Sequence, residues 1–201
     1  MEQVSVMKHA STKTVFAHWN TRRGARPAPA RAEIDPVAIR HALGDTFILA
    51  ADFAGELRFR LAGTRICALF CRELKGEAFG ALWGESGRES IEHLITVVNN
   101  ENIGAVAGVN GRTASGEQAD LELLLLPLAH DGPARVRALG VLAPAAAPYW
   151  LGEKPAAELA LTTLRHLGST PESLGSPSLA PAAEGSRIRR GFVVYSGGKT
   201  G

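Results

Sequence analysis

Hydrophobic and polar positions follow two different periods along this chain. Residues 47–53 form an apolar run, and residues 56–62 contain RFRL, in which polar and apolar side chains alternate as in a β-strand. Only Ala54 and Gly55 separate the two runs, which is the spacing of a tight hairpin. From Arg65 onward, apolar residues recur every three or four positions, which is the period of a helix. The pattern therefore predicts an antiparallel strand pair that leads directly into helical turns.

The helical stretch after this hairpin is divided into short pieces. Gly76, Gly80 and Gly84 interrupt the apolar pattern around residues 64–83, so we expect several short turns there rather than one long helix. Residues 88–100 instead show a continuous amphipathic pattern and predict a longer helix. Its inward stripe consists of Ile91, Leu94, Ile95 and Val98.

Alternating positions return in the second half of the chain. They predict three strands, over residues 103–113, 118–128 and 135–143. Hairpins pair neighbouring strands, and a helical crossover can place the second group of strands beside the first. The sequence therefore predicts an α+β fold with one five-stranded antiparallel sheet, helices on one face, and a cavity between helices and sheet that could hold a small ligand.

A further helix is predicted near the N-terminus, over residues 12–23, with Ser11 or Thr12 as its N-cap. Its apolar face consists of Val15, Phe16 and Trp19. Such a face must be covered, either by a partner protein or by the sheet of the same chain. We therefore take these three residues as interaction candidates and leave both alternatives open.

The segment that follows this helix is a linker, because the prolines of GARPAPARAEIDP prevent a regular helix. Asp35 before Pro36 then predicts a second short helix over residues 36–43, with the aspartate as its N-cap.

The pattern weakens beyond residue 144. Leu161, Leu164 and Leu167 are spaced as in a helix within residues 155–168. Residues 169–186 are rich in Ser, Pro and small side chains and predict disorder. Residues 187–198 could form an edge strand, dock on a partner, or belong to a disordered tail. The expected organisation is an N-terminal helix and linker (1–35), a folded domain (36–145) and a largely disordered C-terminal extension (146–201).

Composition is ordinary for a globular protein, with 45% hydrophobic and 21% charged residues among 201. No apolar run approaches the roughly 18 to 20 residues that span a bilayer, and the first residues do not have the pattern of a signal peptide. We therefore expect a cytoplasmic protein without membrane contact. The two cysteines, Cys67 and Cys71, have no second pair with which to form a four-ligand zinc site, so no metal is expected.

The net charge of +2 conceals basic ends. Residues 1–40 carry seven Lys and Arg against three acidic side chains, and no acidic residue follows Glu184. Basic ends can bind nucleic acid, but no aromatic side chains alternate with these arginines to stack on bases. Solvated charges on the chain ends are therefore the simpler interpretation.

Three separated blocks resemble a known family. They are Trp19 with Arg22 and Arg23, then PARAEIDP at 29–36, then RFRLAGTRICALFCRELKG at 58–76 with LW at 82–83. In this order they are similar to a family of small bacterial PAS proteins, which have one PAS domain and short extensions, and the resemblance covers roughly residues 15–145. The chain departs from the family at Cys71, where glycine is expected.

The resemblance implies a five-stranded antiparallel sheet, and it implies sensing, protein interaction and homodimerisation rather than catalysis. No ligand or cofactor follows from it, because family members differ in what they bind. The strand that ends near Leu61 would deliver the chain, through Gly63 and Thr64, to the helices that form the wall of the cavity. The candidates for lining this cavity are Phe59, Leu61, Ile66, Leu69, Phe70 and Leu94.

Two chemical alternatives come from other PAS proteins. Some hold haem through a histidine on the long helix, and His93 lies on the predicted helix here, although off its apolar stripe. Flavin photosensors need a reactive cysteine, and Cys67 lies in the corresponding segment without the surrounding pattern of those proteins. Asn110 and Gln118 do not provide an ordered set of amides for a flavin ring.

Enzyme motifs are weaker still. GGKT near the C-terminus lacks the earlier glycine of a phosphate-binding loop, and Asp120 with Glu122 fits the solvated face of a strand. The leading hypothesis is a non-enzymatic sensor or adaptor that passes a signal to an unidentified protein. A nucleic-acid-associated regulator and a haem sensor are the alternatives.

Overall fold

The computed structural model describes residues 7–129, 137–167, 186–189 and 192–195. The chain divides into two units, Met1–Gly168 and Ser169–Gly201. The boundary therefore lies after residue 168 and not after residue 145, and the N-terminal helix belongs to the first unit. The second unit contains two paired strands, β7 (Ser186–Arg189) and β8 (Phe192–Tyr195). Most of the segment predicted to be disordered, 169–186, lies outside the described residues.

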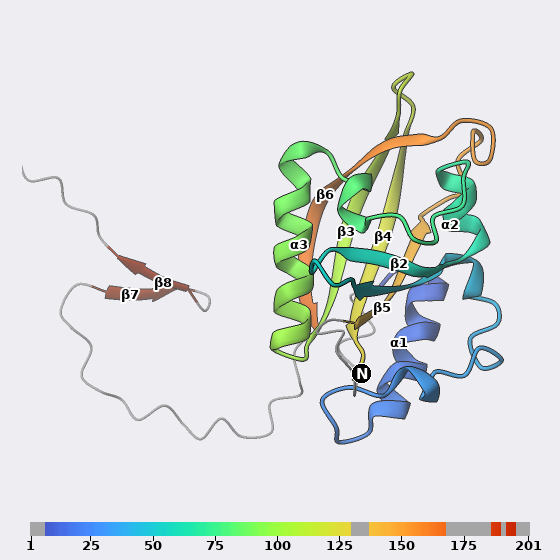
Figure 1. Cartoon of the computed structure of the whole chain (residues 1–201). Coiled ribbons are helices and arrows are strands. Elements are labelled where there is room, and N and C mark those ends of the chain that lie inside the picture. The colour runs from blue at the N-terminus through green and yellow to red at the C-terminus, as the bar shows by residue number, and fades with distance from the viewer. Residues whose placement is uncertain (1–6, 130–136, 168–185, 190–191, 196–201) are drawn as a thin grey trace, which may run out of the picture. The chain divides into compact units, whose positions relative to one another are not determined.

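The first unit is built on one antiparallel sheet of six strands in the order β2-β1-β5-β4-β3-β6 (Figure 1). The strands are β1 (Thr46–Ala51), β2 (Leu57–Ala62), β3 (Gly104–Thr113), β4 (Gln118–Pro127), β5 (Arg137–Pro144) and β6 (Ala156–Leu167). The five strands expected from the sequence are confirmed within a few residues. The sixth, β6, was not expected.

Strand β6 corrects the helix predicted over residues 155–168. It pairs with β3 along its length, and a β-bulge at Thr162 shifts the register between Val109–Leu161 and Gly108–Thr163. Because of this extra residue, Leu161 and Leu164 pair with Val109 and Ala107, which both face the same core. The three-residue spacing of Leu161 and Leu164 is therefore that of a bulged strand, whereas Leu167 lies on the opposite face, in the outer core.

Helices cover both faces of the sheet, and not one face as expected. On one side are α2 (Thr64–Leu69), the short 3-10 helix η4 (Phe79–Leu82) and α3 (Glu85–Asn100), with α3 alongside β3 and β6 in Figure 1. On the other side is α1 (Ala10–Arg23). The short turns over 64–83 and the long helix after them are confirmed.

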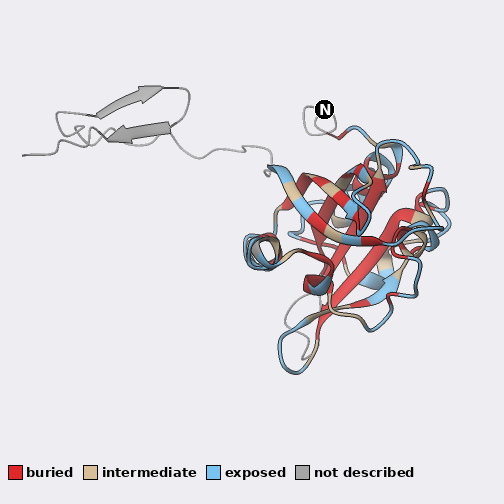
Figure 2. Ribbon diagram, turned by 90° about the horizontal axis from the view of Figure 1, so that it is seen from above, coloured by how far each residue is buried: buried red, intermediate tan, exposed pale blue. Residues whose placement is uncertain are grey.

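Two hydrophobic cores result. The inner core, between the sheet and α2, η4 and α3, includes Phe47, Phe59, Ile66, Phe79, Trp83 and Leu94. The outer core, between the sheet and α1, includes Val15, Phe16, Trp19, Val106, Leu126 and Val141. Strand β4 contributes to both, because Leu123 and Leu125 face the inner core and Leu124 and Leu126 face the outer core. Because β4 is buried on both faces, its sequence is a nearly continuous run of leucines. Figure 2 shows the central strands of the sheet coloured as buried.

The helix predicted over residues 36–43 is a series of turns. Backbone bonds here span three residues, from Arg40 N–H to the Val37 carbonyl and from Ala42 N–H to the Ile39 carbonyl, so no α-helical turn forms. The expected cap at Asp35 is present, since its carboxylate accepts the Val37 N–H at 2.9 Å. The segment ends in the 3-10 helix η3 (Leu43–Asp45).

Candidate functional site

The inner core contains a cluster of four aromatic rings. Phe47 on β1, Phe59 on β2 and Phe79 on η4 lie with ring centroids 5.5 to 5.7 Å apart, and Trp83 lies 5.7 Å from Phe79. Most pairs meet edge to face, which is a favoured arrangement of aromatic quadrupoles. The sheet, the 3-10 helix and the loop after it are thus joined through aromatic contacts.

Phe47 occupies its place because the strand beside it has no side chain there. Gly140 on β5 pairs directly with Phe47, and a Cβ atom at Gly140 would lie 2.1 Å from the ring. The ring therefore lies flat on the backbone of β5. This glycine lets a phenylalanine occupy the centre of the inner core.

Trp83 places an unsatisfied hydrogen-bond donor in this core. Its side chain is buried, with 3% of the residue exposed, and its indole Nε1–H has no acceptor within the described part of the chain. The backbone around it is fixed to β6 by the Gly84 N–H, which donates to the Leu159 carbonyl at 3.3 Å. A buried N–H without a partner loses its hydration without compensation, at a cost of about 1–3 kcal/mol. An acceptor bound in the inner core would recover that energy.

Five of the six pocket candidates lie together in the inner core: Phe59, Ile66, Leu69, Phe70 and Leu94. Leu61 does not, since 39% of it is exposed and it pairs with Ile48 of the outer core. A register shift between Ile48 and Leu49 makes Arg60 an extra residue, which turns Leu61 to the face opposite Phe59. Strict alternation could not reveal this bulge.

An ion pair between a half-exposed arginine and a buried carboxylate lies where the chain passes from the sheet to the helices. Arg65 on α2 donates from Nε to Asp45 Oδ1 at 2.6 Å and from Nη2 to Oδ2 at 2.7 Å. Ser11 on α1 donates from Oγ to the same Oδ2 at 2.6 Å. Asp45 is only 1% exposed, and its hydrogen bonds raise the pKa of Arg65. One carboxylate thus joins η3, α1 and α2.

Two glycines allow this junction to close. A Cβ atom at Gly44 would lie 2.8 Å from the Arg65 guanidinium carbon, and one at Gly63 would lie 2.2 Å from the Leu43 carbonyl oxygen. The conformation of Gly63 is extended, with φ −70°, so close approach rather than backbone freedom requires glycine there. The sequence LAGTR therefore encodes a site of close backbone contact as well as the start of a helix.

The interaction candidates on α1 are covered by the chain itself. Val15, Phe16 and Trp19 are buried in the outer core, and the Trp19 Nε1–H donates to the Pro127 carbonyl at 2.8 Å. Of the two alternatives left open by the sequence, the structure shows the sheet of the same chain against this face. The guanidinium of Arg23 lies 4.9 Å from the Trp19 ring centre.

At the other end of α1, the backbone provides the contacts. The amides of Lys8 and His9 donate to the Glu122 carboxylate on β4 at 2.7 and 2.9 Å. Glu122 is therefore bonded to the chain and does not have the solvated role expected from the sequence. His9 also caps α1 through Nδ1, which accepts the Ser11 N–H at 3.1 Å, whereas Ser11 or Thr12 was expected as the cap.

Of the residues suggested for haem or flavin, only Cys67 packs against the inner core. His93 is exposed on α3, so the described inner core gains no axial ligand from it. Cys67 is half-buried beside Glu73, and burial raises the pKa of its thiol, which disfavours the reactive thiolate. Asn110 donates to Gln118 and Asp120 at 3.4 and 3.2 Å, where these side chains are exposed. The arrangement does not fit either group.

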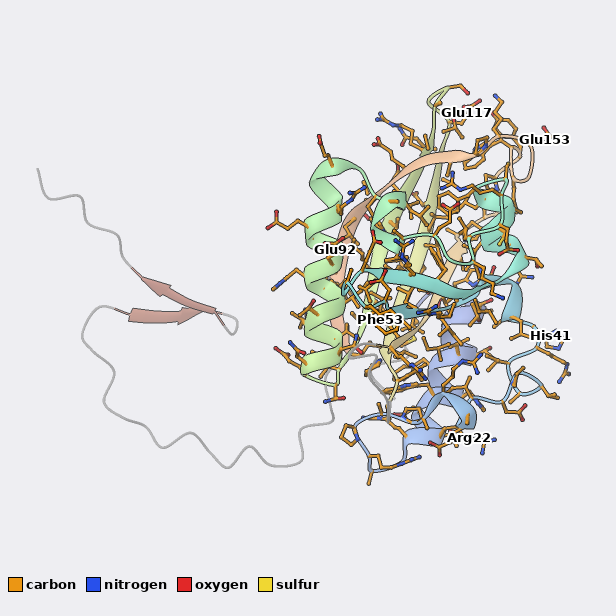
Figure 3. All side chains as sticks on the ribbon, viewed as in Figure 1. Arg22, His41, Phe53, Glu92, Glu117 and Glu153 are labelled. Atoms are coloured by element: carbon orange, nitrogen blue, oxygen red, sulfur yellow. The ribbon has the colours of Figure 1, made fainter. Side chains whose placement is uncertain are left out.

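An exposed aromatic side chain is held on an ordered turn. Phe53 is fully exposed at the tip of the β1–β2 hairpin (Figure 3). Asp52 organises the turn by accepting the amides of Ala54 and Glu56 at 2.9 and 3.0 Å and Arg58 Nε at 2.8 Å. Rigid exposed aromatics of this kind are suited to protein contacts.

Within the described ranges, no three His, Cys, Asp or Glu side chains gather as metal ligands. Among the helices of those ranges, none has both the length and the apolar character needed to cross a bilayer. Two basic residues at the chain ends bear on the nucleic-acid alternative. Near the N-terminus, Arg26 forms an ion pair with Glu33 at 2.8 Å. Near the C-terminus, Arg190 lies outside the described residues.

Comparison with known proteins agrees with this architecture. A sequence model described as the PAS domain matches residues 7–143, more than half of the chain. The chain belongs to the PAS domain family. Membership places it among the sensor domains of signalling proteins, and the matched range includes α1. Strand β6 lies beyond the match.

Solved structures similar to this PAS domain are distant in sequence. A PAS domain structure from Colwellia psychrerythraea is 15% identical, with a TM-score of 0.40 over 55% of this chain and 97% of the other. A structure from a flavin-analogue study of a light-oxygen-voltage domain is 14% identical, with a TM-score of 0.43 over 56% and 85% of the two chains. No curated protein matches the chain.

Proposed function

We propose that this PAS domain is a cytoplasmic sensor and adaptor without catalytic activity, which binds a small, mainly apolar molecule in its inner core and acts as a homodimer on another signalling protein. The observation that carries the proposal is the buried indole N–H of Trp83, which has no acceptor among the side chains and backbone that the structure describes. Family membership supports the sensing role.

The chemistry around Trp83 defines the ligand class. The neighbouring groups are phenyl rings and aliphatic side chains, so the bulk of the ligand must be apolar. The free donor of Trp83 calls for an acceptor atom, such as a carbonyl or ether oxygen. The ligand class is therefore small aliphatic or aromatic molecules with one such oxygen.

Binding must change the packing of the core, because aromatic rings already fill the centre of the cluster. The segment after α2 contains Gly76 at φ +88° and Gly80 within η4, so its backbone can adjust while the sheet stays in place. A ligand that prefers the adjusted packing would increase its population. The output would then pass through surfaces that this change reaches.

Partner contact is supported by the presentation of Phe53. The backbone of its turn is ordered by Asp52, so little backbone entropy remains to be lost when a partner covers the ring. An adaptor needs such a permanent contact point in addition to surfaces that respond to the ligand.

The test is native mass spectrometry of the freshly purified full chain, followed by tryptophan fluorescence titration with a panel of small carbonyl and ether compounds. We expect either a retained small-molecule mass or a saturable fluorescence change. Trp83→Phe should weaken binding about 10-fold, the loss of one buried hydrogen bond. Trp150→Phe, in the same core, is the matched control and should bind as the wild type does.

Two results would contradict the proposal. One is a wild-type protein that carries no ligand and gives no saturable change with any member of the panel. The other is equal loss of affinity in both tryptophan variants, because it would show that core volume, and not the Trp83 donor, determines binding. The masses in the same native spectrum also test the homodimer.

A further inference from the structure

Asp45 connects helices that lie on opposite faces of the sheet. Arg65 reaches it from α2, whose Ile66 and Leu69 belong to the inner core, and Ser11 reaches it from α1, which covers the outer core. We infer that Asp45 mechanically couples α2 to α1, so that displacement of Arg65 releases the N-terminal end of α1. Arg65 and Asp45 are positioning residues in this arrangement.

The geometry makes the coupling specific. Arg65 binds both carboxylate oxygens, which fixes the plane of the carboxylate and aims Oδ2 at Ser11. The guanidinium also donates to the His41 carbonyl at 3.0 Å and lies directly over Gly44. A shift of α2 therefore also moves the Asp45 carboxylate.

The end of α1 that receives this contact has few other polar anchors. Besides Ser11, the polar contacts to the sheet at this end come from Lys8 and His9, just before the helix, whose amides donate to Glu122. The hydroxyl of Thr12, one residue after Ser11, is buried and has no hydrogen-bond partner among the described residues, so docking of this turn includes an uncompensated desolvation. Loss of the Ser11 contact thus acts next to a buried hydroxyl whose desolvation is not compensated.

The coupling extends the proposed sensing function by giving the inner core a route to the outer face. It is nevertheless a property of the ligand-free protein. Its test uses no ligand, so the coupling and the ligand hypothesis can fail separately.

The test is hydrogen–deuterium exchange of the full chain with Arg65→Gln, which removes the ion pair without touching α1. We expect amides 13–16 of α1 to exchange about 10-fold faster, while amides 94–98 of α3 keep their wild-type rates. Arg72→Gln is the control, because the Arg72 side chain is as exposed as that of Arg65 but pairs, at 3.0 Å, with the exposed Glu77 away from the junction. It should leave α1 unchanged.

Reciprocity provides the decisive measurement. Ser11→Ala removes only one hydroxyl. If Asp45 couples the helices, this variant must also speed exchange of the Cys67 amide of α2, which donates to the carbonyl of the N-cap residue Gly63. A double-mutant cycle then compares the fold-increase in the exchange rate of the α1 amides. For Ser11→Ala combined with Arg65→Gln, the increase should be less than the product of the two single increases. For Ser11→Ala combined with Arg72→Gln, it should equal that product.

Unchanged α1 exchange in Arg65→Gln overturns the inference, and so does independence of Ser11 and Arg65 in the cycle. If Arg65→Gln also speeds exchange of the α3 amides, the variant unfolds globally and cannot test the coupling by itself. The effect of Ser11→Ala on exchange of the Cys67 amide then decides whether the coupling exists. Absence of that effect then overturns the coupling.

Discussion

Cys71 shows how one residue can preserve a motif that usually requires glycine. Helix α2 ends in a Schellman motif, with Cys71 N–H on the Ala68 carbonyl at 3.2 Å and Arg72 N–H on the Cys67 carbonyl at 3.1 Å. The position after the C-cap is left-handed in this motif, and Cys71 adopts φ +51°. The glycine expected from the family resemblance therefore has a physical reason, and the cysteine keeps the geometry at the expense of strain.

Cys71→Gly should stabilise the protein by about 1 kcal/mol, because glycine adopts the left-handed conformation without a clash at Cβ. Urea denaturation measures the change. Cys71→Ala is the control and should bring no comparable gain, since it retains Cβ. A glycine variant no more stable than the alanine variant would show that the strain is negligible.

Thr12→Val should also stabilise the protein by about 1 kcal/mol, because it replaces a buried hydroxyl that has no partner by a methyl group of similar shape. The same denaturation measurement applies. Thr21→Val, at an exposed threonine of α1 that donates to the Ala17 carbonyl, should change stability by less than about 0.5 kcal/mol. Destabilisation by Thr12→Val would argue against the missing hydrogen bond.

At the scale of elements, α1 is tied to the linker through a neutral histidine. His18 Nε2 accepts the Asp35 N–H at 3.0 Å. Burial lowers the pKa of His18, and the charge of Arg22 lowers it further, against the opposing effect of Asp35. The folded protein therefore favours the unprotonated ring, which leaves the acceptor free.

The pH dependence follows from this direction. The unfolded chain binds the proton more readily, so the contribution of His18 is complete above its ordinary pKa of about 6.5 and declines as the pH falls toward the lower pKa of the folded protein. Glu33 and Glu117, with pKa values of about 2, do not titrate in this range.

We expect the urea midpoint of the wild type to fall between about pH 7.5 and about pH 5.5 by more than that of His18→Gln, whose amide oxygen can still accept the Asp35 amide without titrating. The difference between the two proteins separates His18 from the other histidines. Identical pH profiles would show that the contact does not sense protonation.

For the whole molecule, the sixth strand completes a domain whose family match ends at residue 143. Leu159 of β6 and Trp150 before it are buried in the inner core, and β6 pairs along β3. Without them β3 would be an open edge beside an incomplete core. The segment from 146 to 167 is therefore part of the fold, although it was expected to belong to a largely disordered extension.

A chain that ends at residue 145 should lose cooperative unfolding or aggregate, because it lacks Trp150, Leu159 and the partner of β3. A chain that ends at residue 168, at the boundary of the first unit, is the control and should unfold cooperatively. Thermal unfolding followed by circular dichroism distinguishes them. Cooperative unfolding of the shorter chain would contradict a structural role for β6.

The sequence by itself determined the local periods: the first hairpin, the long helix α3 with its stripe around Ile91, and three strands with alternating positions. These follow from side-chain spacing alone, because a strand or helix that buries one face must repeat with its own period. The resemblance in three blocks led to the correct family, and five of the six pocket candidates were placed in one core.

Only the tertiary structure decided the rest. Bulges at Arg60 and Thr162 shift the inward–outward alternation of side chains by one residue. The first turns Leu61 away from the inner core, and the second gives Leu161 and Leu164 of β6 a helical spacing. A bulge depends on the partner strand and leaves no local signal in the sequence. The meeting of Ser11, Asp45 and Arg65 depends on close approach at Gly44 and Gly63, between segments distant in sequence. Sequence periodicity specifies which face of an element is buried, whereas the contact that buries it is a property of the folded chain.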